Sequence, residues 1–393
     1  MTPSSSAPFD LGWRSSRLGD ATQISSGLTL GRNLNGRQCR LVPYLRVANV
    51  KDGFLDLRDV KKTLASEEEI AACRLQPGDV LLTEGGDPDK LGRGSYWQGQ
   101  IEECLHQNHI FRIRFDQTNF DPAFLAFQFG SPYGKAYFLR HAKQTTGIAT
   151  INKVVLSNFP LLIPPFAEQR TLAASLLTNL KLIESATKAS QLRRQEFAAL
   201  ADAIIYSSCL QGSSRRVPLG EGLIEVKDGI GSSWKSHLVL GATRGGIAPA
   251  RERPGKHAER YKPVTAGTVF YNPMRILIGS IAFADDDDEA GITSPDYVVL
   301  KGKPGVVDSR WFYYWLRSPP GERCIQSLAR GAVRERMLFN RLAEGEIEIP
   351  DYDTQMKASK ALAQIKPMNA ANQKQITDLE ALPQKLLAQV FKC

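Results

Sequence analysis

The stretch Asn158–Pro165 reads NFPLLIPP and leads into the sequence EQR at 168–170 and a long segment with helical spacing of apolar residues. About 186 residues later, Gly345–Pro350 reads GEIEIP and leads into DTQ at 353–355 and a second segment of the same kind. Solenoid repeats run to about 20–50 residues, so a period this long indicates two copies of one globular domain followed by a helix.

Two shorter echoes have similar spacing. Gly78-Asp79-Val80 is matched by Gly267-Thr268-Val269, and Gly147 is matched by Gly331. A chain with two similar domains suits a partner that presents two similar surfaces, and DNA with two half-sites is the leading example.

The repeat predicts an α+β fold with two pseudo-repeated mixed α/β domains, each followed by a long helical segment. We expect the domains at residues 1–166 and 211–351, and the helical segments at 167–210 and 352–393. Runs rich in β-branched and aromatic residues between turn signals predict strands at 41–50, 80–83, 110–115, 264–271, 276–284 and 297–300. Shorter helices are expected at 122–130, at 133–141 and from residue 311.

Apolar residues recur at three- and four-residue steps in both helical segments, so we expect the segments to pack as an antiparallel coiled-coil spacer. Pro367 and Pro383 should each break or kink the second segment, at a cost of about 3 kcal/mol. The seam is predicted to consist of Leu172, Leu176, Leu180, Ile183, Phe197, Leu200, Ile204, Ile376, Leu379, Leu386 and Val390.

The composition favours a reduced, polyanion-binding protein. Lys and Arg number 50 against 41 acidic residues, which gives a net charge of +9. The six cysteines form no C-x-x-C pair, which fits reduced thiols in the cytoplasm. No apolar run reaches the length of a membrane span, and residues 1–6 lack the features of a signal peptide.

Candidate DNA-binding residues of the first domain lie in two stretches. The glycine-rich loop 84–94 predicts either a close approach of the backbone to DNA or a plain surface turn. The residues around Gly147 supply the cations and small donors that bind phosphates, and amides that can read adenine. The candidates are Lys90, Arg93, Lys143, Gln144, Thr145, Thr146, Asn152 and Lys153.

The second domain offers arginines at the corresponding positions and in other loops. An arginine side chain suits the O6 and N7 atoms of guanine in the major groove. The candidates are Arg244, Arg251, Arg253, Arg275, Arg330, Arg334 and Arg336.

Catalytic motifs are weak or missing. The string Asn272-Pro273-Met274-Arg275 lacks the second proline and the aromatic residue of an amino-methyltransferase loop, and there is no Walker A loop. Pro88-Asp89 and Pro295-Asp296 lack a downstream partner for a nuclease metal site. We therefore expect no catalytic residues and no bound metal.

Two other clusters favour structural interpretations. Cys104, His106 and His109 have the residue types of a zinc site but no complementary pair elsewhere, so a strand-edge cluster is expected. The run Asp285–Asp288 could bind a cation, but such a run is usually a solvated hairpin tip, which we place away from DNA.

The order of domains and helices resembles the specificity subunit of type I restriction–modification enzymes, a phage-defence family. The resemblance covers nearly the whole chain and is strongest at GIATIN (147–152), Leu156, LIPP (162–165) and EQ (168–169). Further matches are Trp13 with LGD (18–20), VPLG (217–220) and GDVLLT (78–83). The second copy departs at GAVR (331–334) and lacks the second proline after Ile349.

The resemblance implies a non-catalytic subunit that reads a bipartite, asymmetric double-stranded DNA site, with one target recognition domain per half-site. It also implies that the spacer binds two methyltransferase subunits, and that restriction subunits can add to the complex. The chain itself would bind no cofactor; S-adenosylmethionine would serve the methyltransferase, and ATP and Mg the nuclease. The alternatives are a stand-alone DNA-modifying or DNA-cleaving enzyme and a basic nucleic-acid-binding scaffold.

Overall fold

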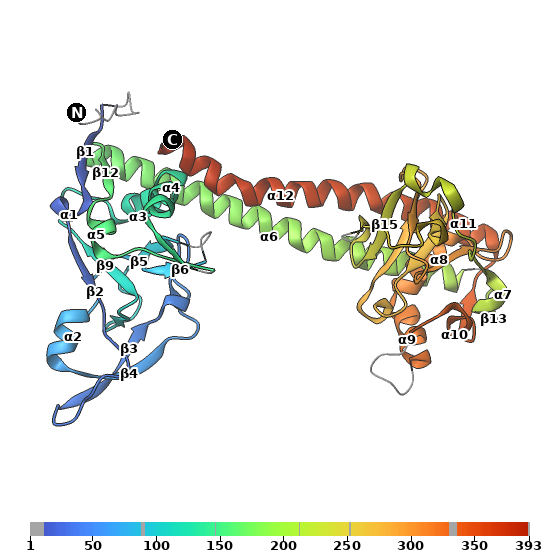
Figure 1. Ribbon diagram of the computed structural model, residues 1–393, viewed down its shortest axis with the longest axis horizontal. Coiled ribbons are helices and arrows are strands. Elements are labelled where there is room, and N and C mark those ends of the chain that lie inside the picture. Colours follow the sequence, from blue (N-terminus) through green and yellow to red (C-terminus); the bar gives the residue numbers. More distant parts are fainter. Residues whose placement is uncertain are drawn as a thin grey trace. The chain divides into compact units, whose positions relative to one another are not determined.

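The computed structural model describes residues 12–87, 91–145, 147–211, 213–250, 253–329 and 336–391. The chain divides into two compact units. Unit 1 comprises Met1–Lys188 with Thr377–Cys393, and unit 2 comprises Ala189–Ile376. Two long helices, α6 (Phe166–Leu210) and α12 (Ile365–Val390), each contribute a part to both units (Figure 1).

Unit 1 contains a four-stranded antiparallel sheet in the order β2-β9-β5-β7, and a three-stranded sheet in the order β4-β3-β8, in which β3 and β8 are parallel. A two-stranded sheet joins β1 to β12 just before α6. The strands are β1 (Arg14–Arg17), β2 (Gln23–Ser26), β3 (Cys39–Leu45), β4 (Lys61–Ser66), β5 (Val80–Thr83), β7 (Gly94–Tyr96), β8 (Leu105–His106), β9 (Ile110–Arg114) and β12 (Pro160–Ile163).

The helices of unit 1 begin where the sequence supplies caps. The carboxylate of Asp121 accepts a hydrogen bond from Phe124 N at 2.9 Å and Pro122 occupies the first helical position, so α3 starts there. Ser131 caps α4 in the same way. The helices and turns are α1 (Leu18–Ala21), η1 (Val47–Asn49), α2 (Glu67–Cys73), α3 (Pro122–Gly130), α4 (Pro132–His141) and α5 (Lys153–Ser157).

Unit 2 repeats this topology. Its four-stranded sheet has the order β14-β21-β18-β19, a second sheet has the order β16-β15-β20-β17 with β15 parallel to β20, and β13 pairs with β22 just before α11. The strands are β13 (Arg215–Pro218), β14 (Leu223–Glu225), β15 (Leu238–Thr243), β16 (Gly246–Pro249), β17 (Lys262–Val264), β18 (Thr268–Tyr271), β19 (Ile281–Ala284), β20 (Gly291–Thr293), β21 (Val298–Gly302) and β22 (Glu346–Ile349).

The helices of unit 2 follow the same plan. Asp308 caps α8 as Asp121 caps α3, by accepting a hydrogen bond from Trp311 N at 2.8 Å. The helices and turns are α7 (Leu219–Gly222), η3 (Gly231–Ser236), η4 (Ala258–Arg260), η5 (Ile276–Ile278), α8 (Ser309–Arg317), α9 (Pro319–Leu328), α10 (Phe339–Leu342) and α11 (Tyr352–Ala363). The sequence repeat is therefore also a repeat of the fold.

A buried glutamine joins each domain to the helix that follows it. Gln169 donates from Nε2 to the carbonyls of Asn119 (3.1 Å) and Pro164 (3.0 Å), and its Oε1 accepts from the backbone N–H of Asp121 (3.0 Å). Gln169 thus ties the first turn of α6 to the strand end before it and to the start of α3. We call this arrangement the glutamine clamp.

Unit 2 contains the same clamp about 186 residues later. Gln355 donates to the carbonyls of Val306 (3.0 Å) and Pro350 (2.9 Å), and it accepts from the N–H of Asp308 at 2.9 Å. Gln169 and Gln355 are both buried. The DTQ string at 353–355 therefore aligns with EQR at 168–170 through its glutamine, with Gln355 at the position of Gln169.

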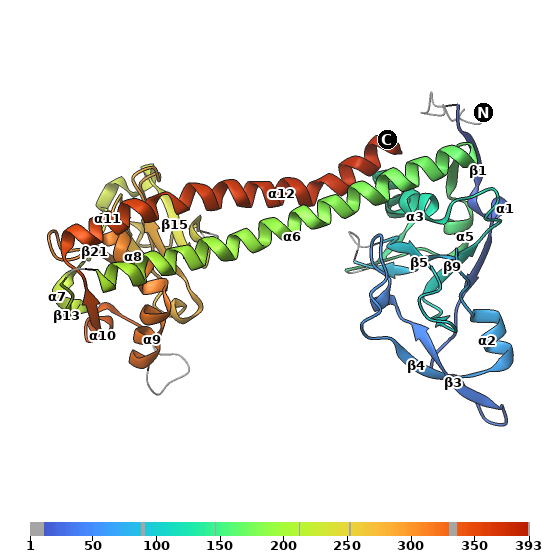
Figure 2. The same ribbon diagram turned by 180° about the vertical axis from the view of Figure 1, so that it is seen from behind.

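The helices α6 and α12 pack against each other within each unit (Figure 1 and Figure 2). In unit 1, Leu172, Leu176 and Leu180 near the start of α6 share a core with Leu386 and Val390 near the end of α12. In unit 2 the end of α6 packs with the start of α12: Ala201 and Ile205 share a core with Ile365, and Asn372 Nδ2 donates to Ser190 O at 2.9 Å. The two helices therefore run antiparallel, as predicted.

The predicted seam residues differ in burial. Phe197 and Ile204 pack in the core of unit 2, Ile376 is buried, and Ile183 and Leu379 are half-buried. Leu200 is 46% exposed, whereas the neighbouring Ala201 and Ile205 are buried.

Within the described residues, none of the helices has the length and apolar character that a membrane span requires.

The prolines of the second helical segment act differently from each other. The break lies at Gln364, between α11 and α12, because Pro367 has no N–H to donate to the carbonyl of Ala363 four residues earlier. The predicted break at Pro383 is wrong, since α12 continues through that residue. Packing of Leu386, Leu387 and Val390 beyond the proline holds the helix in place.

Two predicted strands are also corrected. The run 276–284 is a 3₁₀ turn, η5, followed by the strand β19, because Gly279 takes the left-handed conformation at φ +81° between them. The run 264–271 is divided between β17 and β18, with Gly267 at φ +78° in the connecting turn. Backbone turns at these glycines therefore interrupt both apolar runs.

The glutamine clamp should contribute more to the free energy of unfolding than an ordinary surface contact does. Gln169→Leu leaves the N–H of Asp121 and two carbonyls without their partner, so unit 1 should lose about 3 kcal/mol of unfolding free energy. Gln355→Leu should have the same effect on unit 2. Urea unfolding measures the loss, and hydrogen exchange assigns it to a unit. Exposed Gln191→Leu on α6 is the matched control, and a loss equal to that of the control would contradict the clamp.

Pro383→Ala should stabilise the chain by up to about 3 kcal/mol, because it restores a donor in the interior of a helix. Pro367→Ala should give no comparable gain, since a first-turn residue needs no intrahelical partner. Thermal unfolding of the two variants side by side tests this difference. Equal shifts in Tm would show that the position of the proline in the helix is irrelevant.

Candidate nucleic-acid interface

The predicted residues around Gly147 lie on a β-hairpin in unit 1. Strands β10 (Lys143–Thr145) and β11 (Ile148–Thr150) pair with Lys143 opposite Thr150, and β11 also pairs with β6 (Gly85–Gly86). Gly147 has φ +82° at the turn, a conformation that favours glycine. The structure therefore brings the Gly147 motif and the glycine-rich loop into one three-stranded sheet.

The glycines of the loop 84–94 are required by contacts inside unit 1. A Cβ atom on Gly85 would lie 2.7 Å from Cγ2 of Thr150, and one on Gly92 would lie 2.5 Å from the ring of Phe138. Internal packing thus explains these glycines without an external partner. Arg93 is half-buried, and its carbonyl accepts from Thr83 N at 2.9 Å. Its contact with DNA stays a prediction.

The candidates after the hairpin have separate roles. Asn152 caps α5 by accepting from Val155 N at 2.9 Å, so its side-chain oxygen already has a structural partner. Lys143, Gln144 and Lys153 are exposed, and in the described ranges neither lysine forms an ion pair. Thr145 lies in β10, whereas Lys90 and Thr146 fall outside the described residues.

Three predicted arginines of unit 2 lie on loops that contact one another or a common neighbour. Arg317 donates to the carbonyls of Arg244 (2.7 Å) and Ile281 (3.0 Å), which joins the β15–β16 turn to the end of the loop that carries Arg275. The segment after Arg336 bonds to the same loop, through Met337 N and Pro273 O at 3.0 Å. Arg317, which no sequence motif singled out, thus positions this group.

The remaining candidate arginines of unit 2 add little to the description of this surface. Arg336 pairs with Asp296 at 2.8 Å, and both side chains are exposed, so the pair contributes little to stability. Arg253 is exposed after β16. Arg251, Arg330 and Arg334 fall outside the described residues.

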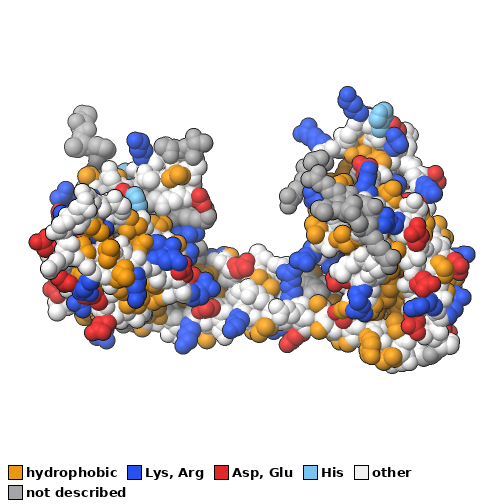
Figure 3. All heavy atoms as spheres, turned by 90° about the horizontal axis from the view of Figure 1, so that it is seen from below, with side chains coloured by type: hydrophobic (Ala, Val, Ile, Leu, Met, Phe, Trp, Pro, Cys, Tyr) orange, Lys and Arg blue, Asp and Glu red, His pale blue; other side chains and the backbone are white. Residues whose placement is uncertain are grey.

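The candidate surfaces of the two units are topologically equivalent. The glycine-rich loop follows β5 in unit 1, and the loop with Arg275 follows β18, the corresponding strand of unit 2. On the face in Figure 3, basic side chains occur on both units and are interspersed with acidic and hydrophobic ones. The candidate loops are therefore identified by their equivalent positions in the repeated fold and not by a concentration of basic side chains.

The acidic run is only partly solvated. Asp286 and Asp287 are exposed, as expected, but Asp285 is only 8% exposed and bonds to Arg310 of α8. Lys366 of α12 bonds to Asp287 and to Asp288, and it holds the pKa of Asp287 below its ordinary value. The expectation of a solvated tip is therefore wrong for Asp285, because its cation comes from a helix 25 residues away in sequence.

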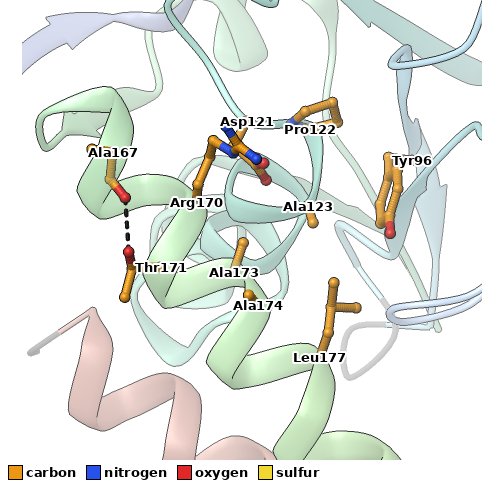
Figure 4. Close-up of a pocket in the computed structure, with 10 residues that line it drawn as sticks. All are labelled: Tyr96, Asp121, Pro122, Ala123, Ala167, Arg170, Thr171, Ala173, Ala174 and Leu177. Atoms are coloured by element: carbon orange, nitrogen blue, oxygen red, sulfur yellow. Dashed lines mark hydrogen bonds between the residues drawn. The ribbon is translucent and has the colours of Figure 1, made fainter.

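Sequence reasoning missed an open groove of about 700 Å³ in unit 1. Figure 4 shows the start of α3 (Asp121, Pro122, Ala123), the first turns of α6 (including Arg170 and Leu177) and Tyr96 of β7 around it. Ala123 follows the capping Asp121 by two residues, as Arg310 follows Asp308 in unit 2. Ala173 follows Gln169 by four residues, as Ser359 follows Gln355. The side chains of Arg310 and Ser359 approach to 3.4 Å, so unit 2 fills the corresponding space.

Cys104, His106 and His109 point to different partners. His106 is buried and bonds to the carbonyl of Ile110 at 3.0 Å, while His109 bonds to Glu84 at 2.7 Å. Burial raises the pKa of the Cys104 thiol to about 12, so the thiol is protonated at neutral pH. Burial also lowers the pKa of His106 to about 4. Cys104 and His106 thus belong to the packing of unit 1, whereas His109 is exposed.

Comparison with known proteins finds one relative that matches nearly the whole chain and one that matches part of it. No family model matches the chain. The putative type I restriction enzyme MjaX specificity subunit of Methanocaldococcus jannaschii is 20% identical, over 95% of this chain and 92% of the relative. The EcoKI specificity subunit of Escherichia coli is 27% identical over 150 residues, which are 38% of this chain and 32% of that one.

Solved structures show the same fold. A chain from a study of complex assembly and conformational transition of the type I restriction–modification system matches with a TM-score of 0.67 and 15% identity, over 98% of this chain and 99% of that chain. The crystal structure of the HsdS subunit from Thermoanaerobacter tengcongensis matches with a TM-score of 0.56 and 17% identity, over 99% and 98%.

The buried His106 should make unit 1 sensitive to acid. In the unfolded chain this imidazole binds a proton below a pKa of about 6.5, whereas in the folded chain it stays neutral down to about 4. Stability should therefore fall as pH drops from about 6.5 to about 4, by roughly 3 kcal/mol. His106→Gln should flatten this dependence in urea unfolding, and exposed His257→Gln is the control. An unchanged slope in the His106 variant would contradict the assignment.

Proposed function

We propose that this chain, which is a type I restriction–modification specificity subunit by sequence and fold, reads a bipartite DNA site with one half-site for each domain. The observation that carries the proposal is the duplicated topology, with candidate loops after equivalent strands of the two four-stranded sheets. A repeated domain presents the same kind of surface twice, and duplex DNA offers two such surfaces along its length.

The two half-sites should differ in sequence. The candidate surface of unit 1 carries Lys143 and Gln144, whereas that of unit 2 carries Arg244 and Arg275. A glutamine amide pairs with the N6 and N7 atoms of adenine, and an arginine pairs with guanine O6 and N7. Lysine binds phosphate as a point charge. Different loops on one repeated scaffold support an asymmetric site.

The helices are the proposed assembly surface. Large apolar side chains on α6 remain exposed after α6 and α12 pack, including Leu182 at 63% and Leu192 at 51%. Such residues suit contact with partner proteins. In this proposal two methyltransferase subunits bind the helices, and restriction subunits add to that core.

The proposed partners carry the chemistry. The methyltransferase subunits would use S-adenosylmethionine, and the restriction subunits would use ATP and Mg. This chain would supply recognition and scaffolding with no catalytic residue of its own. Turnover of DNA by the isolated chain would favour a stand-alone enzyme, and sequence-blind, salt-dependent binding would favour a basic scaffold.

Exchanging one domain tests the partition of specificity. The chain is co-purified with its methyltransferase partners, and methylation of a randomised DNA library gives the recognised site. Replacing residues 12–165 by the domain of a paralogue should change one half of the site and leave the other half unchanged, because each unit has its own core. The matched exchange of residues 213–349 should change the other half. A change in both halves after one exchange would contradict the proposal.

A further inference from the structure

The loop between β18 and β19 in unit 2 exposes three large apolar side chains. Met274 is 61% exposed, Leu277 is 56% exposed and Ile278 is 66% exposed. Single exposed apolar residues are ordinary on protein surfaces, but three within five positions indicate a contact surface. We call these three residues the apolar tip.

The apolar tip is held in a defined conformation. Asn272 accepts from Met274 N through its side chain and from Arg275 N through its carbonyl, both at 2.9 Å. At the other end of the loop, Ser280 Oγ donates to Ala242 O at 2.6 Å, and the adjacent Ile276 is buried. The exposure of the tip is therefore part of the fold, since hydrogen bonds fix the loop on both sides.

The surroundings of the tip favour an anionic partner. Leu277 and Ile278 line a cavity of about 250 Å³ together with Arg244, Arg317 and one acidic residue, Glu322. The Cγ atom of Arg244 lies 3.5 Å from the position that a Cβ on Gly279 would take. Arg275 is exposed in the loop itself. A surface with two exposed arginines, Arg244 and Arg275, beside an apolar centre suits DNA better than it suits a purely apolar helix.

The loop also occupies the expected place. It follows β18, as the glycine-rich loop follows β5, and the glycine-rich loop joins the hairpin that carries Lys143 and Gln144. The apolar tip thus lies in the loop that is equivalent to part of the candidate DNA surface of unit 1. In an undistorted duplex, the aliphatic group on a base edge is the 5-methyl group of thymine in the major groove.

We infer that the apolar tip reads thymine in the half-site of unit 2 through its 5-methyl group, beside the contacts that Arg244 and Arg275 make. This inference rests on the proposed function and adds a chemical group that unit 2 selects. Apolar contact distinguishes thymine from cytosine and from deoxyuridine, which arginine contacts to phosphate cannot do.

The test uses the complex of the full chain with its methyltransferase partners. After the site is mapped, each thymine in duplex oligonucleotides is replaced in turn by deoxyuridine, which lacks only the methyl group. Fluorescence anisotropy should show about fourfold weaker binding of the wild-type complex at one thymine of the unit 2 half-site. The double variant Leu277→Ala/Ile278→Ala should lose this sensitivity and keep the half-site of unit 1.

Two controls separate the possible outcomes. Ile224→Ala removes an apolar side chain of similar exposure from β14, at the opposite edge of the same sheet, and should keep the sensitivity. Ile278→Thr keeps the branch at Cβ but removes most of the apolar surface, so it should weaken the sensitivity, and hydrogen exchange of unit 2 would reveal a folding defect.

Several results would overturn the inference: a wild-type complex insensitive at every thymine, a half-site of G·C pairs alone, or a double variant that keeps the sensitivity. Loss of assembly with the methyltransferase in the absence of DNA would reassign the tip to protein contact. If the double variant leaves a mapped split site unchanged, only this inference fails. If the wild-type complex methylates no split site, the proposed function fails with it.

Discussion

The glutamine clamp is the interaction on which both units depend. Gln169 and Gln355 each bond to the backbone at three points: the strand end just before the helix, and a helix cap and the residue two positions before that cap, which lie 47–50 residues away in sequence. A buried side-chain amide has two donor hydrogens and an acceptor oxygen, and its burial is tolerated only when these are matched. This requirement fixes the direction in which α6 and α11 leave their domains. It also explains why the junctions are the most similar parts of the two copies.

Beyond the junctions, the two copies have diverged in how they use the same space. Ala123 and Ala173 leave a groove beside α6 in unit 1, whereas Arg310 reaches Ser359 and the carboxylates of Asp285 and Asp286 in unit 2. The acidic run is in turn bound by Lys366 of α12. The recognition domain of unit 2 is therefore joined to its helices by ion pairs as well as by the clamp. Equivalent surfaces of the two units consequently offer different chemistry to a partner.

The parts of the fold that depend on local sequence could be predicted. The uninterrupted apolar spacing from 168 to 206 predicted α6, which extends a few residues further at each end, and β5 was predicted at its observed bounds. The parts that depend on distant contacts could not. Nothing local shows that Ser280 bonds to Ala242, which anchors the turn before β19, or that packing beyond Pro383 keeps α12 continuous. Local preferences are weak compared with tertiary packing.

In the candidate site, too, the features that depend on local sequence could be predicted and the contacts between distant residues could not. Glycine at 147 and the cations near it were apparent from the sequence, and the structure places Gly147 and Lys143 on one hairpin and Lys153 at the start of α5. The partners of individual arginines were not apparent, because Arg310 and Arg336 bond to carboxylates about 25 and 40 residues away. Only a three-dimensional structure can distinguish such arginines from exposed ones such as Arg244 and Arg275.

This distinction limits what the net charge of +9 can mean for binding. Arg114 is bound to the buried Asp79, Arg32 to Glu69, and Arg317 to two carbonyls, so these cations serve the fold. Other cations stay exposed, among them Arg244 and Arg275 on the candidate loops of unit 2. Because these exposed side chains lie outside the clamp and the cores, they can change without altering the scaffold. A duplicated domain with constant junctions and variable loops is therefore suited to acquiring a new half-site in one unit while the other keeps its own.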